Sequence, residues 1–302
     1  MTDELKEGLN VGEKNKKQVC LDLKSGSFFY KSKRLKTDIR SKYKFSDLIA
    51  KILIFKDILF HVKPSADGSS RLSFFLRKIK DPNNQIFEVN INNYPIKFVF
   101  NKNGGLGIIS VRRFEPIVFK YITSQHGEIM IDIGANVGAY SILSSHNFQK
   151  IIAVEPGKES LDILQQNISL NNINNITVIS KAVTNKKGFV KLYKASALVN
   201  YSTENKSESY LEVPTITLNE LLQPFSIIDL VKIDVEGAEL EVIRSGLELI
   251  DRVKNLIIEV RQKYEDEIIS LMSEKGFQCY CLEFRKDVKE KNLLFVNVKN
   301  NQ

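Results

Sequence analysis

Residues 129–138 read IMIDIGANVG, an apolar run that ends at an acidic residue and is followed at once by a glycine-containing turn. The apolar run predicts a strand over residues 129–133, and the residues that follow predict a helix over about 138–146. Gly134 permits a tight turn in which the backbone comes close to a ligand, and Gly138 lets the helix begin close to the strand. The stretch therefore predicts a strand, a tight turn and a helix, in that order.

The same alternation continues toward the end of the chain. Continuous apolar strands separated by helices indicate a parallel sheet that is covered on both faces. One hairpin precedes this pattern, over residues 86–101 around Asn92-Asn93, and a second is inserted in it, over residues 188–193 and 211–217. The predicted fold is α/β, with a Rossmann-like, doubly wound and mostly parallel sheet that binds ligands at the carboxyl ends of its strands. Further strands are predicted at 150–155, 176–183, 229–234, 255–260 and 293–298, and helices at about 115–123, 158–171, 236–250 and 262–275.

Charge divides the chain into two parts. Residues 1–85 hold 19 Lys/Arg against 10 Asp/Glu, whereas residues 86–302 hold 25 against 26. We therefore expect a basic, partly helical N-terminal extension over residues 1–85, with helices at 45–62 and near 71–80, followed by one domain over residues 86–302. Nucleic acid or an anionic membrane surface could use such a charge, although a solvated basic tail is the simpler interpretation.

Compartment and redox state follow from what the sequence lacks. No secretory signal is visible, and the most apolar stretch, residues 48–62, is too short and too charged to span a bilayer. Cys279 and Cys281 share one face of a strand and are expected to be buried thiols, and with Cys20 they form neither a disulfide framework nor a zinc motif. A cytoplasmic setting is the expectation.

Two acidic residues follow the first two strands of the domain and predict a ligand site. Asp132 can attract an ammonium group, directly or through water, while Gly134, Asn136 and Gly138 shape a loop that departs from the GxGxxG pattern of dinucleotide folds. Glu155, before Pro156, ends the second strand and can accept hydrogen bonds from both hydroxyls of a ribose. The pattern indicates a ribosyl ligand without naming it.

A third acidic stretch, KIDVEGAE at residues 232–239, follows the fourth strand of the domain. Asp234 is the best-placed candidate for a general base, because the fourth strand borders the first across the cleft. Glu236 and Glu239 suit the N-terminus of the following helix, where a carboxylate complements the helix dipole. Asp234 and Glu259 could alternatively hold Mg²⁺, which prefers oxygen ligands. The metal question stays open at this point.

Several of these motifs together resemble the FkbM-type methyltransferases, over about residues 112–298. The resemblance implies a class I, Rossmann-like methyltransferase fold, S-adenosylmethionine as the methyl donor, and transfer to a hydroxyl oxygen, often on a sugar or a secondary metabolite. It also implies that residues 132–138, Glu155 and Pro156 bind the donor, and that Ser180, Lys181 and Ala182 border its adenine. The motifs are residues 132–138, Val154-Glu155-Pro156, Asn167 with Leu170-Asn171, Lys181-Ala182-Val183 followed by Gly188, and KIDVEGAELEVIRSG at residues 232–246.

Three other functions compete with this one. An RNA methyltransferase could use the basic extension, but that extension matches no RNA-binding module, so nucleic acid is a less favoured partner than a small-molecule or glycan hydroxyl. A non-catalytic scaffold would not need the glycine loop, Glu155 and Asp234 together. A nicotinamide dehydrogenase is disfavoured because GxGxxG is missing.

Overall fold

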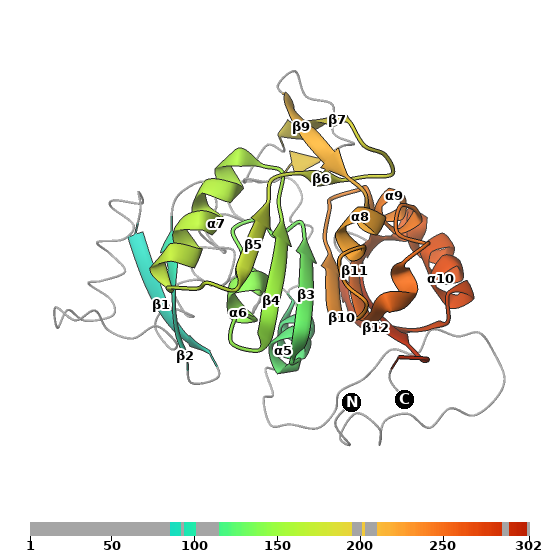
Figure 1. Ribbon diagram of the computed structural model, residues 1–302, viewed down its shortest axis with the longest axis horizontal. Coiled ribbons are helices and arrows are strands. Elements are labelled where there is room, and N and C mark those ends of the chain that lie inside the picture. The colour runs from blue at the N-terminus through green and yellow to red at the C-terminus, as the bar shows by residue number, and fades with distance from the viewer. Residues whose placement is uncertain are drawn as a thin grey trace, which may run out of the picture.

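A seven-stranded sheet forms the centre of the molecule in the computed structural model (Figure 1). The structure describes residues 85–91, 94–100, 115–194, 201–202, 210–285 and 290–300 of the chain. The helices predicted at 45–62 and near 71–80, and with them the basic extension and Cys20, lie outside the described residues.

Five parallel strands and two that close the sheet at one side make up this sheet, in the order β12-β13-β11-β10-β3-β4-β5. Neighbours among β11, β10, β3, β4 and β5 pair in parallel, and β13 is antiparallel to both β11 and β12. The chain order reverses at β3, which lies between β4 and β10, so ligands are expected at the carboxyl ends of β3 and β10. The predicted doubly wound, mostly parallel sheet is confirmed. The strands are β3 (Gly127–Ile133), β4 (Phe148–Val154), β5 (Ile176–Ile179), β10 (Ile228–Ile233), β11 (Val253–Arg261), β12 (Phe277–Arg285) and β13 (Glu290–Asn297).

Helices cover both faces of the sheet, which explains why its inner strands are continuously apolar. Successive residues of β3 point to opposite faces: Met130 packs with one helical layer and Ile131 with the other, and both are fully buried. One layer holds α5 (Pro116–Ser124), α6 (Ala139–Leu143) and α7 (Lys158–Leu170). The other holds α8 (Leu218–Leu222), α9 (Glu239–Arg244) and α10 (Glu265–Glu274).

Three details differ from the sequence-based prediction. The strand predicted over residues 176–183 is two strands, because the chain turns at Ser180-Lys181 and β6 (Ala182–Val183) pairs with β9 outside the main sheet. The helix predicted over residues 236–250 is shorter at both ends: it begins only at Glu239, since Glu236 and Gly237 have positive φ angles of 52° and 117°, and it ends at Arg244. Strand β12, of sequence FQCYCLEFR, was not predicted because polar residues interrupt its apolar ones.

Both predicted hairpins are confirmed, and each is attached to the rest of the domain. β1 (Gln85–Ile91) and β2 (Tyr94–Phe100) pair antiparallel. The side chain of Asn171, just after α7, exchanges two hydrogen bonds of 2.7 Å with the backbone of Lys97, and Asn167 accepts one from the backbone of Val99. Two asparagines of the sequence motif therefore tie the hairpin to α7.

The inserted hairpin forms a second, four-stranded sheet of order β6-β9-β7-β8, beyond the carboxyl ends of β3 and β4 (Figure 1). Its other strands are β7 (Phe189–Lys194), β8 (Tyr201–Ser202) and β9 (Tyr210–Ile216). Within the described part of the chain, no helix has the length and apolar character that crossing a membrane requires.

Candidate active site

The loop between β3 and α6 adopts left-handed backbone conformations at three of its residues. The φ angles of Gly134, Asn136 and Gly138 are 79°, 51° and 86°. The backbone N–H groups of Gly134 and Ala135 both donate to the carbonyl of Val154, which holds the loop over the end of β4. A Cβ on Gly134 would lie 1.8 Å from the backbone oxygen of Asp234, so the loop also touches the end of β10. Only glycine fits at position 134.

Gly138 lies against α7. A Cβ there would lie 2.3 Å from Cδ1 of Leu164, so its missing side chain makes room for α7. The loop thus depends on glycine twice, once against β10 and once against α7.

Glu155 follows β4 directly and is held by the backbone on both sides. Its Oε2 accepts a hydrogen bond from the N–H of Asn136 (2.9 Å) and its Oε1 one from the N–H of Gly157 (2.7 Å). The side chain is buried, and this burial raises the pKa of Glu155 to about 7. A carboxylate has about four acceptor positions, so each oxygen retains one for a further donor. A ribose hydroxyl is such a donor, and the site therefore fits a ribosyl ligand.

A band of polar side chains crosses the sheet near the carboxyl ends of its strands, on the face that α5 and α6 cover. We call it the polar row. Strand register explains it: Asp132 lies opposite Lys232 on the neighbouring strand, and Glu259 lies opposite Asn292. Asp234 follows β10 next to Glu259, because Ile233 pairs with Ile258. The structure thus brings Asp234 and Glu259 together, as the sequence predicted, and places Asp132, Lys232 and Asn292 in the same row.

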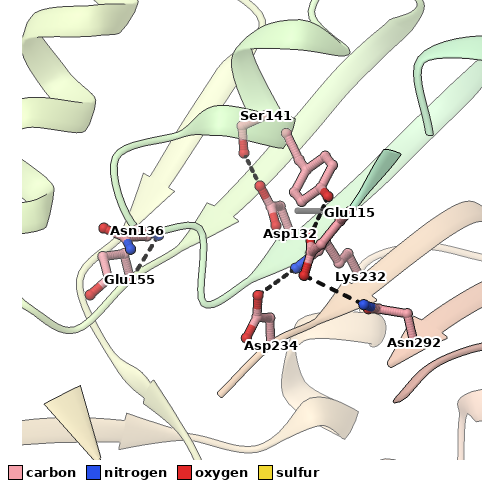
Figure 2. A network of polar contacts seen from close by, with 9 residues as sticks. Glu115, Asp132, Asn136, Ser141, Glu155, Lys232, Asp234 and Asn292 are labelled. Atoms are coloured by element: carbon pink, nitrogen blue, oxygen red, sulfur yellow. Dashed lines mark hydrogen bonds and ion pairs between the residues drawn. The ribbon is translucent and has the colours of Figure 1, made fainter. Parts of the chain in front are cut away.

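Lys232 is the cation of the polar row and is almost completely buried, with 2% of its surface exposed. Its Nζ lies 2.8 Å from Oδ2 of Asp234 and 4.8 Å from the ring centroid of Tyr140 (Figure 2). Burial alone would lower the pKa of Lys232, but the surrounding carboxylates, Asp234 foremost, outweigh it and raise that pKa. The ammonium therefore stays charged and fixes the Asp234 carboxylate.

Glu115, just before α5, adds a third carboxylate beside Asp234 and Glu259. It is buried, and its Oε2 accepts a hydrogen bond of 2.5 Å from the hydroxyl of Tyr140. One carboxylate oxygen from each of Glu115, Asp234 and Glu259 lies within 4.8 Å of the other two. Burial, and next the charge of Asp234, raises the pKa of Glu259 well above its usual range. The arrangement can therefore accept a proton or bind a cation.

Asp132 faces the polar row from β3. Its Oδ2 accepts a hydrogen bond of 2.6 Å from the hydroxyl of Ser141, while its buried Oδ1 accepts none. Burial raises the pKa of Asp132, and the Lys232 ammonium opposes this. The predicted attraction of an ammonium group by Asp132 remains a prediction.

The remaining acidic residues of the 232–239 motif serve the loop before α9. Glu239 is buried and accepts a hydrogen bond of 2.6 Å from the N–H of Gly237, in line with its expected role at the helix N-terminus. Glu236 lies 3.5 Å from Arg261, and burial raises the pKa of Glu236 to about 7. Lys181 and Ala182 lie where the chain passes from β5 to β6, and their contact with adenine remains a prediction.

Other predicted features lie away from this site. His126 precedes the amino end of β3, where its Nδ1 lies 3.1 Å from the carbonyl of Ser124. Cys279 and Cys281 are free thiols; Cys281 is buried in the core, as expected, whereas Cys279 is half-buried and packs against that core.

Comparison with known proteins identifies the family. Residues 132–279 match the model of the methyltransferase FkbM domain. Over 188 residues the chain is 26% identical to "Methyltransferase sdnD" of Sordaria araneosa, a match that covers 49% of this chain and 73% of the relative. Over 167 residues it is 22% identical to "Hexuronic acid methyltransferase AglP" of Haloferax volcanii, covering 54% of this chain and 69% of that protein. A crystal structure of methyltransferase FkbM from Methylobacillus flagellatus aligns at a TM-score of 0.44 and 13% identity, over 83% of this chain and 60% of the other. Residues 132–279 of the chain therefore form a methyltransferase FkbM domain.

Proposed function

We propose that this methyltransferase uses S-adenosylmethionine as its donor and transfers the methyl group to a hydroxyl oxygen of a sugar, glycan or small metabolite. The observation that carries the proposal is the position of the Asp234 carboxylate. It follows β10, next to the glycine loop that touches its backbone, and it ends a row of buried polar groups. Donor-binding groups and a candidate base therefore meet at one edge of the sheet.

The donor side of the site consists of the glycine loop and Glu155. The donor supplies a methyl group on a sulfonium sulfur, which leaves as a neutral thioether. Glu155 binds the two ribose hydroxyls with its remaining acceptor positions, and the left-handed residues of the loop let the backbone approach the amino acid part. Asp132 attracts the ammonium group of that part, while Pro156, Lys181 and Ala182 border the remainder.

The acceptor side consists of the polar row. An alcohol is a poor nucleophile at neutral pH, so a base must take its proton as the oxygen attacks. Asp234 is that base, and the contact of 2.8 Å with Lys232 holds its carboxylate in place. A hydroxyl-rich acceptor also suits the many hydrogen-bond acceptors of this row. The hexuronic acid named for a relative is consistent with a sugar acceptor.

Calorimetric titration of the full chain with S-adenosylhomocysteine, with NAD as a parallel control, tests the donor assignment. We expect micromolar binding of S-adenosylhomocysteine alone. Binding of NAD alone would show that Glu155 receives a different ribosyl ligand, and binding of neither ligand by folded protein would move the proposal toward a scaffold.

The Asp234→Asn variant tests the acceptor side. We expect it to abolish methyl transfer to hydroxylated sugars, measured with a methyl-labelled donor, while S-adenosylhomocysteine affinity stays within about twofold. Glu241→Gln is the matched control, because Glu241 is an exposed acidic residue on α9 outside the site. A loss confined to donor affinity would remove Asp234 from the role of base.

A further inference from the structure

The polar row and Glu115 hold more negative than positive groups in a small buried volume. Glu115 and Asp132 are buried, Asp234 and Glu259 are half-buried, and Lys232 is the cation among them. Carboxylates at this density cannot all stay ionised unless further positive charge balances them. Within this group of described residues, the Lys232 ammonium is outnumbered by the four carboxylates.

Three of these carboxylates are arranged so that they can share one ion. One oxygen from each of Glu115, Asp234 and Glu259 lies within 4.8 Å of the others. Three oxygens within 4.8 Å of one another need lie no farther than about 2.8 Å from an ion placed between them, so a contraction of a few tenths of an ångström reaches the Ca²⁺ distance of about 2.4 Å and a larger one the Mg²⁺ distance of about 2.1 Å. The three residues come from separate parts of the chain: the start of α5, the end of β10 and the end of β11.

A second observation points independently to a ligand at this place. Asn292 of β13 is 1% exposed and reaches toward Glu115 (Figure 2), to whose Oε1 its Nδ2 donates a long hydrogen bond of 3.4 Å. Its Oδ1 is buried and accepts no hydrogen bond. A buried amide oxygen without a donor is costly, since folding has removed its water. The Nδ2 of Asn292 faces Glu115 in this arrangement, and a half-turn of the amide group would bring the Oδ1 toward a cation beside Glu115 and give this oxygen a partner.

We propose that Glu115, Asp234, Glu259 and the Oδ1 of Asn292 bind a hard divalent cation. All four ligands are oxygens, which excludes a preference for soft metals. The inference rests on the proposed methyl transfer and deepens it: a cation at the polar row would hold the acceptor hydroxyl and lower its pKa, so that a weaker base suffices to take its proton. Lys232 then remains the counter-ion of Asp132 and of the second Asp234 oxygen.

Metal binding is tested directly on the full chain with Mn²⁺, followed by electron paramagnetic resonance, after treatment with a chelator. We expect one tight Mn²⁺ per chain, and competition by Mg²⁺ and Ca²⁺ then shows which ion size the site prefers. Glu115→Gln and Glu259→Gln should each weaken Mn²⁺ binding at least tenfold, whereas the exposed control Glu241→Gln should not change it. No bound Mn²⁺ at millimolar concentration, or equal affinity in all three variants, overturns the proposal.

A second measurement uses the wild-type chain alone, so its result does not depend on whether the variants fold. Fe²⁺ with ascorbate and peroxide cleaves the backbone near its binding site, so we expect wild-type fragments that end near residues 115, 234, 259 and 292. Cleavage elsewhere, or none, contradicts the site. Titration with S-adenosylhomocysteine in parallel separates the two proposals: donor binding without Mn²⁺ binding removes the cation alone, and Mn²⁺ binding without donor binding removes the donor alone.

Discussion

Replacing Gly134 by alanine tests the contact between the glycine loop and the end of β10. Gly134 and Gly276 have nearly the same left-handed φ, 79° and 86°, so alanine meets the same backbone strain at both, about 1–2 kcal/mol. Their surroundings differ: the new Cβ lies 1.8 Å from the Asp234 backbone oxygen at position 134, but 3.6 Å from the end of Lys299 at position 276. Gly276→Ala is therefore a matched control for strain without a clash.

The difference between the two variants gives the cost of the clash. Real Cβ contacts essentially never fall below 3.0 Å, so the Asp234 carbonyl must retreat by about 1.2 Å. This movement also strains the hydrogen bond of 3.0 Å from Asp234 N–H to the carbonyl of Ile133. Overpacking of this kind costs about 1–3 kcal/mol. Urea unfolding should therefore show Gly134→Ala less stable than Gly276→Ala by about 1–3 kcal/mol, with weaker S-adenosylhomocysteine binding in Gly134→Ala alone. Equal stability of the two variants would refute the contact.

Four further outcomes are expected. Glu155→Ala should weaken S-adenosylhomocysteine binding more than tenfold in calorimetry while its circular dichroism spectrum is unchanged; an unaltered affinity would remove the ribose assignment. Burial raises the pKa of Glu155 to about 7 from the ordinary 4.5, so the folded protein binds the carboxyl proton more tightly than the unfolded chain does. The protonated Glu155 therefore contributes its full stabilisation of the folded state below about pH 4.5, and this contribution is lost as pH rises through 7. Urea unfolding of wild type should accordingly lose up to about 3 kcal/mol relative to Glu155→Gln between pH 5 and 8, and parallel profiles would contradict that pKa. Lys232→Met should lower the free energy of unfolding by about 3–5 kcal/mol, since it leaves buried carboxylates without their counter-ion. Lys254→Met removes a one-third exposed partner of Asp229 and should lower it by less than about 1 kcal/mol, and similar losses in the two variants would show that burial of the lysine does not matter. Asn171→Ala removes both side-chain bonds to the Lys97 backbone and should speed amide exchange of Lys97 tenfold or more, while unchanged exchange would mean that the hairpin is held elsewhere.

The main sheet was predictable because the pattern of apolar residues in each central strand is itself enough to indicate a buried strand. The strands predicted at 129–133 and 229–234 have apolar residues on both faces, interrupted by Asp132 and Lys232, and a strand buried on both faces has this pattern. The end of the strand predicted at 176–183 was wrong, because the apolar Ala182-Val183, separated from Ile179 by two residues, have the pattern of a continuing strand. Which sheet they join depends on pairing with β9, some 30 residues later, and no local pattern contains that information.

The same distinction separates the site residues. Asp132, Glu155 and Asp234 were predictable because each follows an apolar strand, where parallel topology gathers residues at one edge. The sequence also indicated Lys232, although it was not predicted as a site residue, because a lysine inside an apolar central strand must be buried and paired with an acidic group. Glu115 and Asn292 had no such signal in the sequence, since they reach the site from an α5 terminus and from an antiparallel strand far away in sequence.

The insertion of β13 between β11 and β12 has a consequence for how the protein is made. During synthesis β11 and β12 emerge before β13, so β12 cannot join the main sheet until β13 has been made and has paired with β11. Until then the edge of β11 is open, and open edges invite pairing with other chains. Asn292 travels on that last strand, so the polar row is assembled at the same moment as the sheet. Nascent chains that stop short of residue 290 should therefore be the species that aggregate or recruit chaperones.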